Sequence, residues 1–97
     1  LEAAKVPLQT AKLALDLLAL LPALAQTGNS NAVTDVGVAG LLASAACKGA
    51  LFNVEINLNS IPTDMGMQQR KEMDDIREKC QKLSRSVMQT VNEKLRS

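Results

Sequence analysis

Apolar positions recur along this chain mainly with the spacing of an α-helix, in three long blocks. The blocks cover residues 2–26, 34–59 and 64–96, and polar residues with glycine or proline separate them. Strand-like alternation is confined to residues 54–57, inside the second block, so no β pattern competes. The pattern predicts an all-α protein, an antiparallel helical bundle of three long helices.

The first block is apolar around almost its whole circumference. Between Leu13 and Ala25 only Asp16 is charged, and we expect it to pair with Lys12 one turn earlier. A helix that is apolar on all sides must be covered on all sides, which two further helices do not easily achieve. We therefore expect a missing N-terminal segment, a partner subunit or both to complete the bundle. The uncapped start at Leu1 also indicates a domain that begins upstream.

The second block carries a face of small residues. Thr34 is a good N-cap, and Asp35 follows in the first turn, where the helix dipole favours an anion. At 100° per residue, an arc of about 80° holds one carboxylate, four alanines and two carboxamides. These residues are Asp35, Ala39, Ala43, Ala46, Ala50, Asn53 and Asn57. We expect this face, together with the interior glycines of the block, to permit close approach by another backbone or a flat ligand.

The third block is apolar on one side only. It starts at Thr63-Asp64, and its apolar residues recur at intervals of three or four. They are Met73, Ile76, Cys80, Leu83, Val87, Val91 and Leu95. The opposite side is charged, as expected for a surface helix. Over residues 64–96 the helix would be about 50 Å long, which is long for a compact monomer of this size.

Composition narrows the possible partners. The 97 residues carry a net charge of +1 and one aromatic residue, Phe52, which suits a single domain without a nucleic-acid partner. The most apolar run, residues 13–25, is shorter than the about 20 residues needed to cross a bilayer, so we expect no membrane partner. Cys47 and Cys80 form no CxxC motif. They indicate reduced, packed thiols in a cytoplasmic protein.

The chain contains no histidine, which excludes Ser–His and Cys–His nucleophile pairs. Two distant cysteines are a poor zinc site, so no metal or other cofactor is expected. Proton transfer would fall to Asp, Glu, Lys or Cys side chains.

Two segments resemble a known family. They are Asn31-Ala32-Val33-Thr34-Asp35-Val36 and Gly49-Ala50-Leu51-Phe52-Asn53-Val54-Glu55-Ile56-Asn57-Leu58. Together with the Val6-Pro7-Leu8 step, they are similar to the cyclodeaminase/cyclohydrolase domain of the formiminotransferase-cyclodeaminase family. The resemblance covers roughly residues 5–61. The glycine-rich segment that precedes these helices in the family is missing, so the resemblance assigns residues 1–97 to the C-terminal part of a single domain.

The resemblance implies a dimeric, all-helical enzyme of folate one-carbon metabolism that works without a metal. Its reaction would be closure of 5-formiminotetrahydrofolate to 5,10-methenyltetrahydrofolate with loss of ammonia, or hydrolytic opening of the methenyl compound. A carboxylate such as Asp35 is suited to stabilise the cationic species or take the proton. The carboxamides of Asn53 and Asn57 are suited to a pterin edge, and Asn29 and Asn31 are further substrate-binding candidates.

Each candidate also has a purely structural interpretation. Asn53 and Asn57 are equally suited to interhelical hydrogen bonds, and Asn29 and Asn31 are turn formers. Three lysines suit a folate's glutamate tail, although solvation is their ordinary state; they are Lys5, Lys12 and Lys48. Two alternative functions remain open: a helical dimerisation or scaffold module, and a folate-binding relative without turnover. The expected partner is a second copy of the chain or a polypeptide carrying the N-terminal segment.

Overall fold

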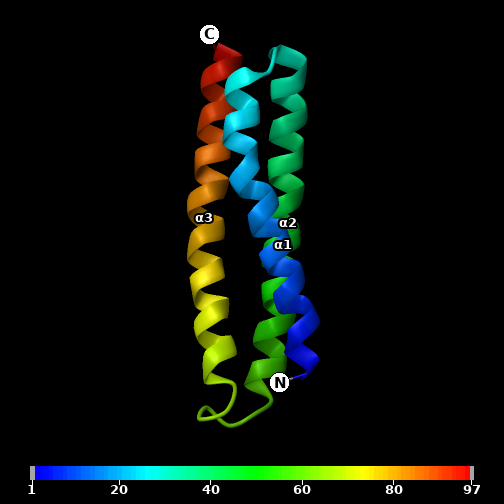
Figure 1. The fold of residues 1–97 in the computed structure, drawn as a ribbon, viewed down its shortest axis with the longest axis vertical. Helices are drawn as coiled ribbons and strands as arrows, with labels where there is room; N and C mark the ends of the chain where they lie inside the picture. Colours follow the sequence, from blue (N-terminus) through cyan, green and yellow to red (C-terminus); the bar gives the residue numbers. More distant parts are fainter. Residues whose placement is uncertain (1, 97) are drawn as a thin grey trace.

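The computed structural model describes residues 2–96, which form three helices (Figure 1). Helix α1 spans Glu2–Thr27, α2 spans Ser30–Asn59 and α3 spans Met67–Arg96. Helix α2 runs antiparallel to α1 and α3, and each helix contacts both others. The bundle measures 52 × 17 × 15 Å. These features confirm the all-α bundle of three long helices. Leu1, where the sequence indicated an uncapped start, lies outside the described residues.

Helix α2 begins earlier than the sequence indicated. Its N-cap is Asn29, whose side-chain oxygen accepts a hydrogen bond from the Ala32 amide at 3.0 Å. Thr34 lies inside the helix, where its hydroxyl donates to the Asn31 carbonyl at 2.8 Å. The prediction of Thr34 as N-cap is therefore wrong, because Asn29 is an equally good cap one turn upstream. Asp35 accordingly lies beyond the first turn, where the field of the helix terminus is weaker.

Helix α3 begins at Met67, later than the predicted start at Thr63-Asp64. Gly66 has φ +65°, a left-handed conformation that glycine adopts without steric cost. Its carbonyl accepts the first helical hydrogen bond, from the Arg70 amide at 2.9 Å. The turn that precedes α3 therefore extends through Gly66, which the apolar pattern did not reveal.

Arg70 connects this turn to the end of α2. Its Nη2 donates to the carbonyl of Leu58 at 2.8 Å and is also within 3.4 Å of the carbonyls of Ile61 and Pro62. Its Nε donates to the carbonyl of Met65 at 3.2 Å. Backbone carbonyls at a helix C-terminus lack intrahelical donors, and the guanidinium supplies a donor to that of Leu58 and to carbonyls of the following turn.

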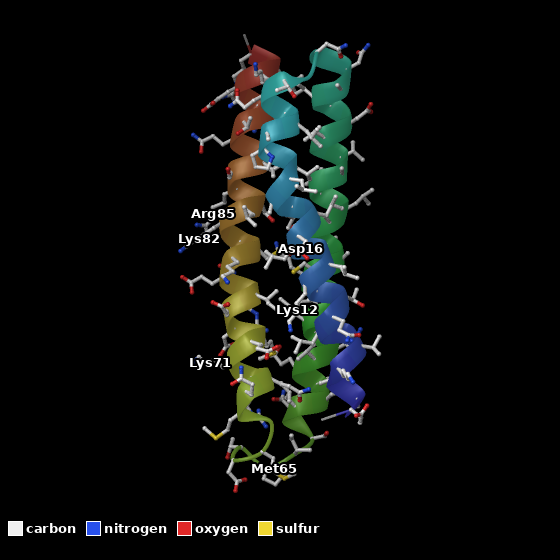
Figure 2. The ribbon with its side chains drawn as sticks, viewed as in Figure 1. Lys12, Asp16, Met65, Lys71, Lys82 and Arg85 are labelled. Atoms are coloured by element: carbon white, nitrogen blue, oxygen red, sulfur yellow. The ribbon has the colours of Figure 1, made fainter. Side chains whose placement is uncertain are left out.

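The core lies along the axis of the bundle and consists of small and aliphatic side chains from all three helices. Five of the seven apolar residues predicted for the third helix are buried, Leu83 is half-buried, and Leu95 is exposed. The one-sided pattern of α3 is thus confirmed. Lys82 and Arg85 extend away from the bundle on its outer side (Figure 2).

Glycines bring α2 close to α3. A Cβ on Gly40 would lie 2.8 Å from Cγ1 of Val87, and one on Gly37 would lie 3.2 Å from Cγ1 of Val91. The predicted small face of α2 turns partly toward α1, with Ala43 and Ala50 buried and Ala46 exposed. The backbones of α1 and α2 approach each other extensively, and the sequence alone did not place the second close contact, where Gly37 and Gly40 meet α3.

Helices α1 and α2 leave many large apolar side chains exposed. On α1 they are Val6, Leu13, Leu17, Leu20 and Leu24, and on α2 they are Val38, Leu41, Leu42, Phe52 and Ile56. We call these ten residues the apolar face. By length and composition alone, both helices are apolar enough to cross a membrane, a property shared with core helices of soluble proteins.

The expected ion pair between Lys12 and Asp16 is wrong. The Lys12 ammonium lies 2.9 Å from the Glu72 carboxylate of α3, and Asp16 is exposed. A contact between helices thus replaces the i,i+4 pair, because α3 presents a carboxylate beside α1. Figure 2 labels Lys12 and Asp16 on α1.

Candidate functional site

Three of the predicted site residues lie at or near the N-terminus of α2. The side chain of Asn29 caps α2 through its bond to the Ala32 amide, so it has a structural role. Asn31 and Asp35 are exposed, and the structure shows no ion pair for Asp35 among residues 2–96. The N-terminal end of α2 therefore presents two exposed polar groups that another molecule can contact, the Asp35 carboxylate and the Asn31 carboxamide.

The other two predicted residues lie near the opposite end of α2. The Asn57 Nδ2 donates to the Ala3 carbonyl of α1 at 3.3 Å and to the Asn53 carbonyl at 2.8 Å. Asn57 thus makes the interhelical hydrogen bond that its structural interpretation required. The side chain of Asn53 is exposed, so its carboxamide is available to another molecule.

Asn53 lines a groove between α1 and α2. The groove has a volume of about 460 Å³ and is bordered by Val6, Pro7, Thr10, Ala46, Gly49, Ala50 and Asn53. A Cβ on Gly49 would meet nothing within 4 Å, so the groove is open above this residue. Its walls are apolar, with one carboxamide and one hydroxyl as polar groups. Such a shape suits a flat ring with a polar edge.

Thr10 is a groove residue that the sequence analysis did not single out. Its hydroxyl donates to the Val6 carbonyl at 3.0 Å, which leaves the hydroxyl oxygen as an acceptor. Its position one turn after the Val6-Pro7 step is the only sequence signal for it. That step belongs to the segments that carry the family resemblance.

One chain does not bring Asp35 and Asn53 together. Both lie on α2, which is continuous from Ser30 to Asn59. Eighteen residues of helix separate them by about 27 Å. A single reacting centre cannot contact both side chains of one chain.

The lysines differ in their surroundings. Lys12 is held by Glu72 at 2.9 Å, whereas Lys5 and Lys48 are exposed and have no ion pair within residues 2–96. The ammonium of Lys12, and to a smaller extent the Gln68 amide, lowers the pKa of Glu72 by hydrogen bonding to its carboxylate. Lys48 borders a second hollow, which lies between α2 and α3.

This second hollow has a volume of about 230 Å³. Its borders are Lys48, Leu51, Phe52, Arg77, Cys80 and Gln81. Arg77 lies 3.6 Å from the Glu55 carboxylate and 3.3 Å from that of Asp74. Burial, followed by the neighbouring Cys80, raises the pKa of Cys47 to about 12. Within residues 2–96 no group of three or more His, Cys, Asp or Glu side chains is arranged to hold a metal ion.

The fold defines an all-α domain with an incompletely covered apolar surface. A family model described as formiminotransferase-cyclodeaminase matches residues 1–73, and the chain belongs to this family. The match includes α1, α2 and the beginning of α3, and it contains every predicted site residue. Comparisons with curated proteins and with solved structures gave no match. The family membership confirms the resemblance and supports a folate-related domain.

Proposed function

We propose that this chain forms part of a folate one-carbon enzyme. The reaction is closure of 5-formiminotetrahydrofolate to 5,10-methenyltetrahydrofolate with release of ammonia, or the related opening of the methenyl ring by water. The observation that carries the proposal is the family match over residues 1–73. The substrate is a tetrahydrofolate derivative, and the proposed mechanism uses only side chains of the protein.

The groove supports a role in binding the pterin. A pterin is flat, with an edge of alternating donors and acceptors, and the Asn53 carboxamide can both donate to and accept from such an edge. The open space above Gly49 leaves room for the ring beside it. Asp35 then acts at the one-carbon unit, where its carboxylate stabilises the developing cation or removes the N10 proton. Asn31 is a further contact, whereas Asn29 and Asn57 hold the backbone in place.

The distance of about 27 Å along α2 requires that the site be shared between chains. In an antiparallel α2–α2 pair related by a two-fold axis near residue 44, Asp35 of one copy lies level with Asn53 of the other. The same register places Val38 of one copy level with Ala50 of the other and within one helical turn of its Phe52. Val38 and Phe52 are both exposed members of the apolar face. A second copy would thus cover apolar surface and complete the site.

The apolar face supports the proposal of a protein partner, and the two free cysteines support that of a cytoplasmic location. Ten exposed apolar side chains on two adjacent helices exceed the scattered few that a soluble surface ordinarily carries. A homodimer, or a polypeptide that supplies the N-terminal segment, accounts for this face. Size-exclusion chromatography with light scattering tests whether the chain associates, and a vesicle-binding assay tests whether it binds lipid. A dispersed monomer that does not bind lipid vesicles would contradict the protein partner. Binding to vesicles would indicate that a membrane covers the apolar face instead.

Turnover and ligand binding distinguish the enzyme from the two alternatives. With the assembled protein we expect methenyltetrahydrofolate to form from the formimino compound, measured by its absorbance. Binding of 5-formyltetrahydrofolate without any turnover would support the non-catalytic folate binder. Absence of both would leave the helical scaffold, which the apolar face alone favours.

A mixing experiment tests the shared site. We expect Asp35→Asn and Asn53→Ala each to remove most of the turnover while helicity and dimerisation persist. After subunit exchange, mixing the two should restore about a quarter of the parent activity, since about half of randomly formed dimers are hybrids with one intact site. Gln81→Ala, at an exposed position outside the groove, is the matched control and should retain activity. No recovery after confirmed exchange would exclude the shared site.

A further inference from the structure

A pair of serines fixes the register between α2 and α3. The Ser84 hydroxyl donates to the Ser44 hydroxyl at 2.9 Å. The helices are antiparallel, so one turn forward from Ser44 is level with one turn back from Ser84. Cys47 and Cys80 occupy these two positions. The structure thus places the two cysteines level with one another on facing helices, and Cys80 contributes, after burial, to the raised pKa of Cys47.

Near this level, α2 and α3 pack closely against each other. Gly40, two turns from Cys47, allows the side chain of Val87 to contact the α2 backbone. A disulfide requires Cβ atoms about 3.8 Å apart, which helices separated by large side chains do not provide. Here Gly40 and Ser44 of α2 contact Val87 and Ser84 of α3 directly.

The two thiols differ in their surroundings. Both side chains are buried, but Cys80 borders the 230 Å³ hollow. The Cys47 thiol faces inward and donates to the Ala11 carbonyl at 3.7 Å. Cys80 is therefore the thiol that a small reagent reaches first.

We propose that Cys80 and Cys47 form a peroxide-reactive dithiol that closes a disulfide between α2 and α3. The Cys80 thiolate attacks hydrogen peroxide, the O–O bond breaks, and Cys80 becomes a sulfenic acid while hydroxide leaves. The Cys47 sulfur then attacks the sulfenic sulfur, and water departs with the Cys47 proton. The two thiols are oxidised by two electrons, and one peroxide is reduced to two waters. This inference is independent of the proposed folate chemistry.

Oxidation changes the bundle in two ways. The disulfide links residues on α2 and α3 covalently, so the thermal midpoint of unfolding rises. It also removes the Cys47 thiol proton, and with it the hydrogen bond to Ala11 of α1. The contact between α1 and α2 at this level thus depends on the redox state of the thiols.

The proposal is tested by intact-mass measurement after treating the full chain with a small molar excess of hydrogen peroxide. We expect the loss of two hydrogens in mass, reversed by dithiothreitol, and a Cys47–Cys80 link in the peptide map. The intramolecular disulfide should form faster in buffer than in urea, since folding brings the thiols together. An unchanged mass, disulfides only between chains, or a faster reaction in urea would overturn the proposal.

Single substitutions assign the order of the steps. In Cys47→Ser, peroxide should yield a Cys80 sulfenic acid that dimedone traps. In Cys80→Ser, dimedone labelling of Cys47 should be at least tenfold weaker. Equal labelling of both variants would overturn the order. Circular dichroism of each variant confirms that the helices persist, and the mass measurement on the parent chain requires no variant.

Discussion

Gly40 and Val87 set the spacing between α2 and α3. A Cβ on Gly40 would lie 2.8 Å from Cγ1 of Val87, closer than such atoms are found. The glycine therefore has a steric role in a helix where it is otherwise unfavourable by about 1 kcal/mol. This contact holds α3 against the part of α2 that also carries the two central polar residues, Ser44 and Cys47.

Gly40→Ala should destabilise the bundle. Overpacking of this kind costs about 1–3 kcal/mol, and the gain in helix propensity offsets about 1 kcal/mol of it. Gly49→Ala is the matched control, because a Cβ there meets nothing within 4 Å, and it should stabilise α2. Urea unfolding of both variants measures the difference. If Gly40→Ala were as stable as Gly49→Ala, the two helices would not be in close contact at Val87.

Arg70→Met should lower the free energy of unfolding by about 1–3 kcal/mol, because partly buried carbonyls lose a charged donor. The guanidinium bonds the carbonyls at the end of α2 and in the following turn, with the shortest distance 2.8 Å to Leu58. Arg85→Met, on the exposed outer side of α3, removes the same charge without those bonds. Chemical denaturation compares the two variants, and equal losses would show that only net charge matters.

Asn57→Ala and Asn53→Ala should have different effects, although the two residues lie one turn apart. Asn57→Ala removes bonds to the Ala3 and Asn53 carbonyls and should lower stability by about 1 kcal/mol. Asn53→Ala removes an exposed carboxamide and should weaken folate binding with little change in stability. Thermal unfolding and ligand titration on both variants check this. The assignment fails if Asn57→Ala leaves the melting temperature unchanged.

The Lys12–Glu72 ion pair should make a small, pH-dependent contribution to stability. The folded state lowers the pKa of Glu72, so the contribution is present above the unfolded pKa and disappears as the pH falls through the folded value. Lys12→Met should therefore melt below the parent chain at neutral pH, and the two should converge once the pH falls below the lowered pKa of Glu72 in the folded state. Lys82→Met serves as the control, since its pairing with Glu78 is within one exposed helix. A difference that persists in acid would rule out this origin.

The sequence predicted the helices better than their ends. Apolar spacing located all three helices, and the row from Met73 to Val91 identified the buried side of α3. The N-cap of α2 was misplaced because Asn29 and Thr34 are both good caps, and local sequence does not decide between them. The start of α3 depended on Gly66, whose positive φ follows from how the chain turns.

For the candidate site, the sequence indicated which residues to consider and the family. The structure showed which of these residues have a structural role and which are exposed to a ligand. Asn57 and Asn29 proved to hold the backbone, whereas Asn53 proved to line a groove with Thr10, which the apolar pattern did not single out. The sequence predicted that Asp35 and Asn53 lie on the same helix, and the structure agrees. A shared site that contains both side chains therefore depends on a second chain.

The sequence by itself determined the helical class, the family and the small residues of α2, because period and composition are local properties of the chain. Only the tertiary structure decided which helix each residue faces. Gly40 meets Val87, Ser44 meets Ser84, and Lys12 pairs with Glu72 of α3 instead of Asp16. Such contacts depend on the rotation and register of whole helices, which are set by the packing of all three together.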